Sequence, residues 1–208
     1  MSEYHKIQTI FKRDQKTNKI IEGSYSLPEI EFLKDNHWVW TEKVDGTNVR
    51  VMWNGTDVTF GGKTDNSQIP ATLVTRLNNM FMTIEQRQKL KEIFPDYDAC
   101  LYGEGYGAKI QTGRNYKATQ DFVLFDIKVG LWWLKREDVK EIALKLGVDV
   151  VPISFEGTVE KAIEHVRQGL TSSWGNFIAE GLVGRPAVEL KSRNGDRIIT
   201  KIKHKDFK

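Results

Sequence analysis

The chain has a single cysteine, Cys100, and only five prolines and four histidines among its 208 residues. One cysteine excludes an intramolecular disulfide and any zinc site built from several thiolates, and it is typical of a reducing compartment. The histidines stand far apart in the sequence, so they give no support for a histidine metal site. The prolines are spread out, and no linker, internal repeat or low-complexity stretch divides the chain. We therefore expect one continuous domain over residues 1–208.

Long apolar runs are also absent. No stretch approaches the roughly 18 apolar residues of a membrane span, and the first ten residues lack the apolar core of a secretory signal. With 39% hydrophobic and 28% charged residues, the composition is that of a folded globular protein rather than of a disordered or membrane protein. We expect an intracellular protein with no membrane partner.

The net charge of +3 hides an asymmetry. From Lys191 to the end, seven basic side chains outnumber two acidic ones, so this segment carries +5 and the rest of the chain about −2. A basic segment suits a polyanion, either a nucleic acid or a nucleotide phosphate, although a solvated charged end has the same composition.

Hydrophobic patterning predicts short strands between turns. Asn54-Gly55 and Asn194-Gly195 are strong hairpin signals, the second between strands at 188–190 and 197–199. A capping-box pattern at Thr83 opens a helix over 83–94, and further helices are expected around 139–146 and over 158–168. Hairpins with separated helices predict an α+β fold of antiparallel sheets flanked by helices, not a Rossmann fold. The expected strands are 38–42, 49–53, 57–60, 99–104, 122–127, 181–185 and 197–203.

The most informative segment is 41–50, Thr-Glu-Lys-Val-Asp-Gly-Thr-Asn-Val-Arg. Lys43 ends one expected strand, Asp45 and Gly46 make a turn, and an alternating strand follows. A lysine in this place projects from the rigid edge of a sheet. Lys-x-Asp-Gly by itself is a weak signal, because an ordinary hairpin turn uses the same residues.

Later segments strengthen the signal because they bring charged groups in a particular order. They are Gly-Glu-Gly at 103–105, Phe-Asp-Ile at 125–127, Glu-Gly-Leu-Val at 180–183 and Lys-Ile-Lys at 201–203. With the Lys43 segment, this ordered set resembles the nucleotidyltransferase motifs of covalent polynucleotide ligases and mRNA capping enzymes. The resemblance is strongest to the RNA ligases similar to bacteriophage T4 RNA ligase 2.

The resemblance runs from Glu42 to Lys203 and implies a ligase-type nucleotidyltransferase (adenylation) domain that uses ATP with Mg²⁺ or Mn²⁺. It implies that Lys43 is the adenylylated nucleophile and that Glu42 contacts the base. It also implies that Phe125 stacks on the adenine and that Glu104 holds the ribose or a metal ion.

The residue types suit this chemistry. A lysine amine must be neutral to attack an α-phosphorus, whereas the ordinary pKa of lysine is about 10.4. Desolvation, a bound divalent cation and the like charges of Lys201 and Lys203 each favour the neutral amine. The same two lysines would balance the charge of the α-phosphate and of the departing pyrophosphate. Glu104 and Glu180 are candidate ligands for hydrated Mg²⁺, which takes one or two carboxylates plus phosphate oxygens.

Asn48 lies five residues after Lys43. The RNA ligases that the chain resembles carry asparagine there, whereas DNA ligases and capping enzymes usually carry arginine, so the resemblance favours RNA. An amide both donates and accepts hydrogen bonds, which suits a ribose hydroxyl or a terminal phosphate. Lys63 stands where the similar ligases generally have arginine. It is a candidate for binding the 5′-phosphate, without the bidentate fork of arginine.

Further phosphate contacts are expected from the loop after Glu104, where Lys109, Arg114 and Lys117 lie, and from the basic end. Many relatives continue into a separate C-terminal domain, whereas this chain ends five residues after Lys203. We therefore expect a minimal catalytic domain without a separate C-terminal domain. Such a domain would hold its substrate weakly, depend on an accessory protein, or prefer a nick in an RNA duplex or RNA/DNA hybrid.

The leading hypothesis is an ATP-dependent RNA ligase of RNA repair that joins 5′-phosphate and 3′-hydroxyl ends through a lysyl-AMP intermediate. Two enzymatic alternatives stay open on the same fold: sealing of DNA nicks and GTP-dependent capping. A third is a non-catalytic nucleic-acid-binding module, against which the retention of every charged motif residue argues.

Overall fold

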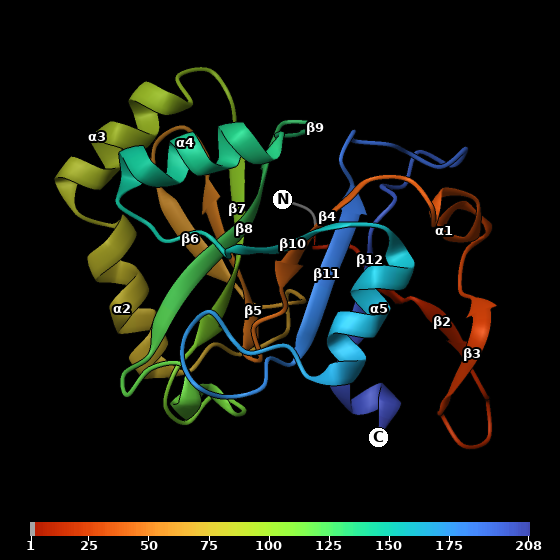
Figure 1. The fold of residues 1–208 in the computed structure, drawn as a ribbon. Coiled ribbons are helices and arrows are strands. Elements are labelled where there is room, and N and C mark those ends of the chain that lie inside the picture. The colour runs from red at the N-terminus through yellow and green to blue at the C-terminus, as the bar shows by residue number, and fades with distance from the viewer. Residues whose placement is uncertain (1–2) are drawn as a thin grey trace. The chain divides into compact units, whose positions relative to one another are not determined.

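The computed structural model describes residues 3–208 and divides the chain into two compact units (Figure 1). The central unit consists of residues 3–5 and 45–151, and the terminal unit of residues 6–44 and 152–208. The chain therefore passes from one unit to the other three times, after His5, after Val44 and after Val151. That the whole chain acts as one domain stays a prediction.

The central unit is built on a five-stranded antiparallel sheet in the order β6-β5-β7-β8-β9. The Asn54-Gly55 hairpin is confirmed, with Gly55 at φ 89° joining β5 to β6. This conformation is the reason glycine serves the turn. The strands are β5 (Thr47–Trp53), β6 (Val58–Gly61), β7 (Ala99–Tyr106), β8 (Asp121–Val129) and β9 (Trp132–Trp133).

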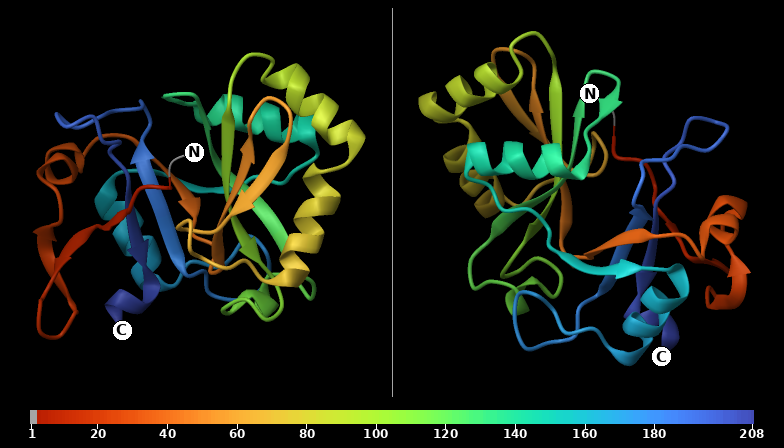
Figure 2. Two further views of the ribbon diagram at one scale, coloured as in Figure 1. Left: turned by 180° about the vertical axis from the view of Figure 1, so that it is seen from behind. Right: turned by 45° about the horizontal axis from the view of Figure 1, so that its top comes forward.

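Three helices pack against this sheet: α2 (Ala71–Phe81), α3 (Ile84–Ile93) and α4 (Arg136–Leu146) (Figure 2). The expected cap of α3 is confirmed, because the Thr83 hydroxyl accepts a hydrogen bond from the Gln86 backbone N–H. Helix α2 was not expected, although Leu73, Leu77 and Phe81 bury one helical face. A short 3₁₀ helix, η1 (Gly113–Asn115), lies in the loop between β7 and β8.

The terminal unit has a second five-stranded sheet, in the order β1-β12-β11-β4-β10. Only β1 runs parallel to its neighbour; the other pairs are antiparallel. Helix α5 (Val159–Gln168) packs on one face of the sheet, capped by Thr158 and ended by Gly169 as expected. The strands are β1 (Gln8–Thr9), β4 (Trp38–Glu42), β10 (Ile153–Gly157), β11 (Gly181–Pro186) and β12 (Thr200–Lys203). The remaining elements are β2 (Phe11–Arg13), β3 (Ile20–Tyr25), α1 (Pro28–Leu33) and η2 (His204–Phe207).

The α+β class is confirmed, but the expected hairpin around Asn194-Gly195 is wrong in part. The turn forms, yet only one bridge, from Lys191 to Arg197, flanks it, and β12 begins at Thr200 rather than at 197. In the β11–β12 register Gly184 faces Thr200, so Pro186 would face Ile198. Because proline has no N–H to donate, the ladder cannot continue there. No helix within residues 3–208 is long and apolar enough to span a membrane.

The neighbouring strands β11 and β4 are held close by a glycine. Gly184 lies opposite Trp40, and a Cβ atom built on Gly184 would come within 2.2 Å of the Trp40 ring. Trp40 is fully buried and stacks on Trp38 with the ring centroids 5.5 Å apart. A side chain at position 184 would therefore displace one of the largest groups in the core of the terminal unit.

We expect Gly184→Ala to lower the free energy of unfolding by about 1–3 kcal/mol, because the added methyl group overpacks a close-packed core. The measurement is urea unfolding followed by tryptophan fluorescence. Gly175→Ala is the matched control, since its Cβ would lie 3.4 Å from the Phe177 ring, an ordinary contact. Equal midpoints for the two variants would contradict the packing argument.

Candidate active site

In the terminal unit, two lysines share one carboxylate at the ends of strands β4, β11 and β12. The Oε2 atom of Glu180 lies 2.6 Å from Lys43 Nζ, and its Oε1 atom lies 2.9 Å from Lys203 Nζ. The three side chains are between 14% and 22% exposed, so they are largely but not fully removed from water. The structure thus joins three of the predicted site residues, which come from positions 43, 180 and 203 of the sequence.

Strand register explains how these residues meet. The Lys43 backbone N–H donates to the Gly181 carbonyl, and Gly181 pairs with Lys203 across β11 and β12. Lys43 and Lys203 therefore share a row on one face of the sheet. Lys201 is two residues before Lys203 on β12, so its side chain leaves the same face. The expectation that Lys201 and Lys203 lie on one strand face is confirmed.

Glu42 points to the opposite face, in the row of Leu182 and Ile202. Its side chain is buried, at 2% exposure, and both carboxylate oxygens are engaged. Oε1 accepts from the Ser172 hydroxyl at 2.6 Å, and Oε2 accepts from the Ser173 backbone N–H at 2.7 Å. The carboxylate thereby fastens the 172–174 loop to the end of β4. A contact of Glu42 with a base stays a prediction.

In the central unit, Asn48 and Glu104 are direct cross-strand neighbours on β5 and β7. Their row belongs to the face away from the helices, since Val49 and Leu101 on the alternate positions lie in the helix-covered core. The Asn48 side-chain oxygen is buried without a hydrogen-bond partner in the described residues. A buried amide oxygen without a donor costs free energy, so it is a ready acceptor for a ligand hydroxyl.

Phe125 lies at a bulge in β8. Tyr102 pairs with Asp126 and Gly103 pairs with Leu124, which leaves Phe125 as the extra residue in the ladder. A bulge of this kind re-aims a side chain and is frequent beside active sites. The ring of Phe125 is half-buried and meets the Tyr4 ring edge-on with the centroids 5.1 Å apart. Sequence alone gave no sign of the bulge.

The predicted phosphate contacts occupy surface loops of the central unit. Lys63, Lys109 and Arg114 are exposed, whereas Lys117 is bound to the Asp121 carboxylate. That hydrogen bond raises the pKa of Lys117 above its usual value. Burial acts to raise the pKa of Asp121, but hydrogen bonds from Arg76 and Lys117 outweigh it and leave that pKa below its usual value. The positive charge of Lys117 is therefore partly balanced by the Asp121 carboxylate.

The proposed metal ligands, Glu104 and Glu180, belong to different units. Within residues 3–208, no group of three or more histidine, cysteine or acidic side chains comes together that could hold a metal ion. Hydrated Mg²⁺ or Mn²⁺ needs only one or two carboxylates when phosphate oxygens complete its coordination. Glu180 already binds two ammonium groups, so its oxygens are placed to receive positive charge.

Two residues that hold the site together were missed by sequence reasoning. Ser172 belongs to none of the motifs and lies in a loop without periodicity. Arg50 sits on β5 and is 1% exposed; it donates to the Gly62 carbonyl and to Asp65, which fixes the loop that carries Lys63. The alternating pattern of this strand predicts a solvated arginine side chain, and only the structure shows that Arg50 is buried.

Comparisons with known proteins add to this geometry. A family model described as RNA ligase matches residues 36–203. A search of curated protein sequences gives no significant match.

Among solved structures, three of the similar chains are forms of an RNA ligase of Naegleria gruberi. A mutant without ligand has a TM-score of 0.71 at 19% identity, covering 100% of this chain and 57% of that one. The complex with PPi has a TM-score of 0.69 at 21% identity, and the match covers 98% of this chain and 56% of that one. A mutant with ATP and Mn has a TM-score of 0.66 at 21% identity, and the match covers 85% of this chain and 52% of that one. At these identities the likeness shows the fold alone, and the chain spans a little over half the length of these proteins.

The contact between Ser172 and Glu42 gives a stability prediction. Ser172→Ala leaves Oε1 of a buried carboxylate without its hydroxyl donor, which we expect to cost about 1–3 kcal/mol in the free energy of unfolding. Ser173→Ala is the control, because residue 173 donates through its backbone and the side chain is exposed. Thermal unfolding of both variants measures the difference. An equal effect of the two substitutions would show that the Ser172 hydroxyl does not support Glu42.

Proposed function

The chain belongs to the RNA ligase family, whose model matches residues 36–203, and from this we propose that it is an ATP-dependent RNA ligase acting through a covalent Lys43–AMP intermediate. The observation that carries the proposal is the Lys43, Glu180 and Lys203 cluster on one sheet face. It supplies an amine, a carboxylate and a second cation within contact distance, which are the groups that nucleotidyl transfer to a lysine requires.

In the first step the neutral amine of Lys43 attacks the α-phosphorus of ATP. A nitrogen–phosphorus bond forms, and the bond from the α-phosphorus to the oxygen that bridges to the β-phosphorus breaks. Pyrophosphate leaves with that electron pair, and the amine releases its proton to solvent. An ammonium has no lone pair, so Lys43 must lose a proton to solvent and its ion pair with Glu180 must break before the attack.

The two following steps transfer and expel AMP. An oxygen of the RNA 5′-phosphate attacks the phosphorus of Lys43–AMP, and the lysine nitrogen leaves with its bonding electrons and takes up a proton. The 3′-hydroxyl of the other RNA end then attacks the 5′-phosphorus, loses its proton, and displaces AMP to form the phosphodiester. Lys201 and Lys203 balance the negative charge on the reacting phosphates.

The other roles follow from the family resemblance. Phe125 would stack on the adenine, Glu42 would contact the base, and Glu104 would bind the ribose or a metal ion. Glu104 and Glu180 have the oxygen donors that Mg²⁺ and Mn²⁺ prefer. A divalent ion held by either carboxylate would supply positive charge against the triphosphate. Opening of the ion pairs on Glu180 would free that carboxylate for the ion and the Lys43 amine for attack.

Asn48 supports RNA as the substrate. Its buried oxygen has no donor in the described residues, so a ribose 2′-hydroxyl can donate to it, whereas the 2′-carbon of deoxyribose carries no hydroxyl. Lys63 and Arg114 are exposed cations for phosphate contacts, with Lys109 and Lys117 on the same loop as Arg114.

We expect incubation with ATP labelled at the α-phosphate and Mg²⁺ to give a covalent protein–AMP species. Lys43→Ala should abolish the label because it removes the nucleophile, and Lys203→Ala should slow labelling about 100-fold because one charge-balancing group is lost. Lys161→Ala, at an exposed lysine on α5, should label like the unsubstituted protein. Denaturing gel electrophoresis of the quenched reactions is the measurement.

Labelling with other nucleotides and a separate nick-sealing assay distinguish the alternatives. Labelling by GTP instead of ATP would indicate a capping-type enzyme, and sealing of a DNA-ended nick better than an RNA-ended one would indicate a DNA ligase. Absence of label with every nucleoside triphosphate would sink the enzymatic proposal and leave a binding module.

A further inference from the structure

A groove of about 810 Å³ lies on the central unit, between α3, α4 and the turn that joins β8 to β9. Its apolar side chains belong to the hydrophobic core of this unit or pack against it, so the groove continues the core to the surface. They are Ile93, Phe94, Val129, Leu134 and Ile142. The volume lies within the range of pockets that bind ligands.

Two aromatic side chains on this groove are exposed to solvent. Trp132 is 63% exposed and Tyr97 is 53% exposed, and their rings meet edge-on with the centroids 6.3 Å apart. The next residue, Trp133, leaves the other side of β9 and packs on Tyr102 with the centroids 5.2 Å apart. The interior of the unit thus uses Trp133 and leaves Trp132 outside. An exposed tryptophan beside an apolar groove is typical of a binding surface.

The charged side chains of the groove are mostly acidic. Glu92, Asp138 and Glu141 line it, and the accompanying cation is Lys145. Lys145 already binds Glu141 at 2.6 Å along α4. Glu92 accepts a hydrogen bond from the uncharged Gln88 amide, and Asp138 forms no recorded ion pair within residues 3–208. The groove therefore carries an excess of negative charge and favours a cationic ligand.

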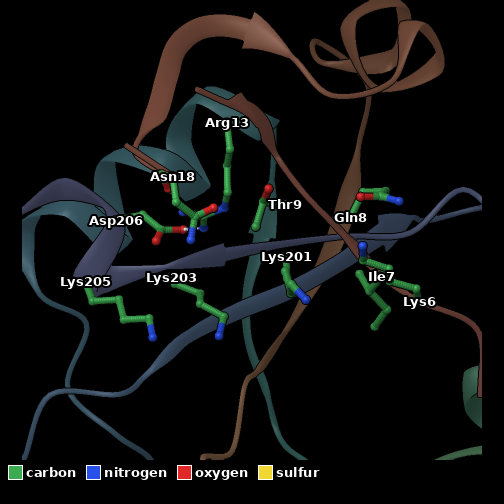
Figure 3. Close-up of a pocket in the computed structure, with 10 residues that line it drawn as sticks. All are labelled: Lys6, Ile7, Gln8, Thr9, Arg13, Asn18, Lys201, Lys203, Lys205 and Asp206. Carbon is green, nitrogen blue, oxygen red and sulfur yellow. Dashed lines mark hydrogen bonds and ion pairs between the residues drawn. The ribbon is translucent and has the colours of Figure 1, made fainter. Parts of the chain in front are cut away.

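The charge of this groove is opposite to that of the surface along β12. Figure 3 shows Lys201, Lys203 and Lys205 extending to the same side of β12 and η2. Such cations attract the phosphates of nucleotides and RNA, whereas the carboxylates of the groove repel them. A nucleobase stacked on Trp132 would bring its own phosphate toward these carboxylates. The charge therefore disfavours nucleic acid as the occupant, and it disfavours an anionic membrane surface for the same reason.

A basic segment of another protein satisfies both features of the groove. Apolar side chains of such a segment would cover the apolar lining and remove it from water. A guanidinium group can stack on the exposed face of Trp132 and bind the carboxylate of Glu92 or Asp138. Tryptophan, tyrosine and arginine are also the residues that most often dominate the binding free energy of protein interfaces.

We propose that this groove binds a segment of an accessory protein in which apolar side chains stand next to lysine or arginine, with Trp132 and Asp138 as principal contacts. The accessory protein expected from the sequence would bind here. The proposal goes beyond the catalytic function, because none of the residues that line the groove belongs to the five motifs.

The test begins with peptides selected from a random-sequence display library on the unsubstituted chain. The enriched peptides should carry lysine or arginine beside apolar residues. One of them, synthesised with a fluorophore, is then titrated by fluorescence polarisation. We expect Trp132→Ser to raise its Kd at least about tenfold, equivalent to about 1.4 kcal/mol. Asp138→Asn should raise the Kd about threefold, and added salt should weaken binding to the unsubstituted chain.

Leu131→Ser and Glu137→Gln are the matched controls. Leu131 is 82% exposed on the same β8–β9 turn, Glu137 is exposed in the same first turn of α4, and neither lines the groove. Both should bind the peptide within about twofold of the unsubstituted chain. Circular dichroism shows whether each variant is folded, and formation of Lys43–AMP should be unchanged in all of them.

Several results would overturn the proposal. They are no enrichment of peptides, enrichment of acidic peptides alone, and equal affinity of the selected peptide for the Trp132→Ser and unsubstituted proteins. A dimer that Trp132→Ser abolishes in sedimentation would assign the groove to a second copy of the chain instead. Loss of RNA binding in that variant would assign it to RNA. Absence of Lys43–AMP from the unsubstituted chain would contradict the proposed function alone, since the peptide titration needs no nucleotide.

Discussion

The carboxylate of Glu180 holds the candidate site of the terminal unit together. Without it, Lys43 and Lys203 would place two ammonium groups side by side on one sheet face, where like charges repel. Because one carboxylate binds both, the two ammonium groups are kept close to each other. On the proposed function, an incoming triphosphate would replace Glu180 as the partner of these cations.

Strand register turns this local interaction into a site. The β4, β11 and β12 strands lie next to one another, so residues 43, 181 and 203 fall in one row although the chain separates them widely. Gly184 lets β11 approach Trp40 closely, and Ser172 satisfies the carboxylate of Glu42 on the other face. The packed face thus supports the positions of the residues on the reactive face.

The central unit uses the same principle with different chemistry. Asn48 and Glu104 come together because β5 and β7 are paired, and Phe125 reaches the same face through a bulge. The hairpin at Asn54-Gly55 and the Thr83 cap were predictable from sequence, because each depends on residues a few positions apart. Helix α2, β12 shortened by Pro186, and the burial of Arg50 were not, because each depends on partners distant in the chain.

The amino-acid sequence by itself determined the α+β class, most strand positions and the ordered motifs that point to lysine nucleotidyl transfer, since alternation and turn chemistry are local properties. Only the tertiary structure decided that Glu180 binds both Lys43 and Lys203. Sheet order and the pairing of strands distant in sequence set these contacts. The order of residues along the chain does not predict these contacts, because the hydrogen-bonding register of the strands depends on packing across the whole unit.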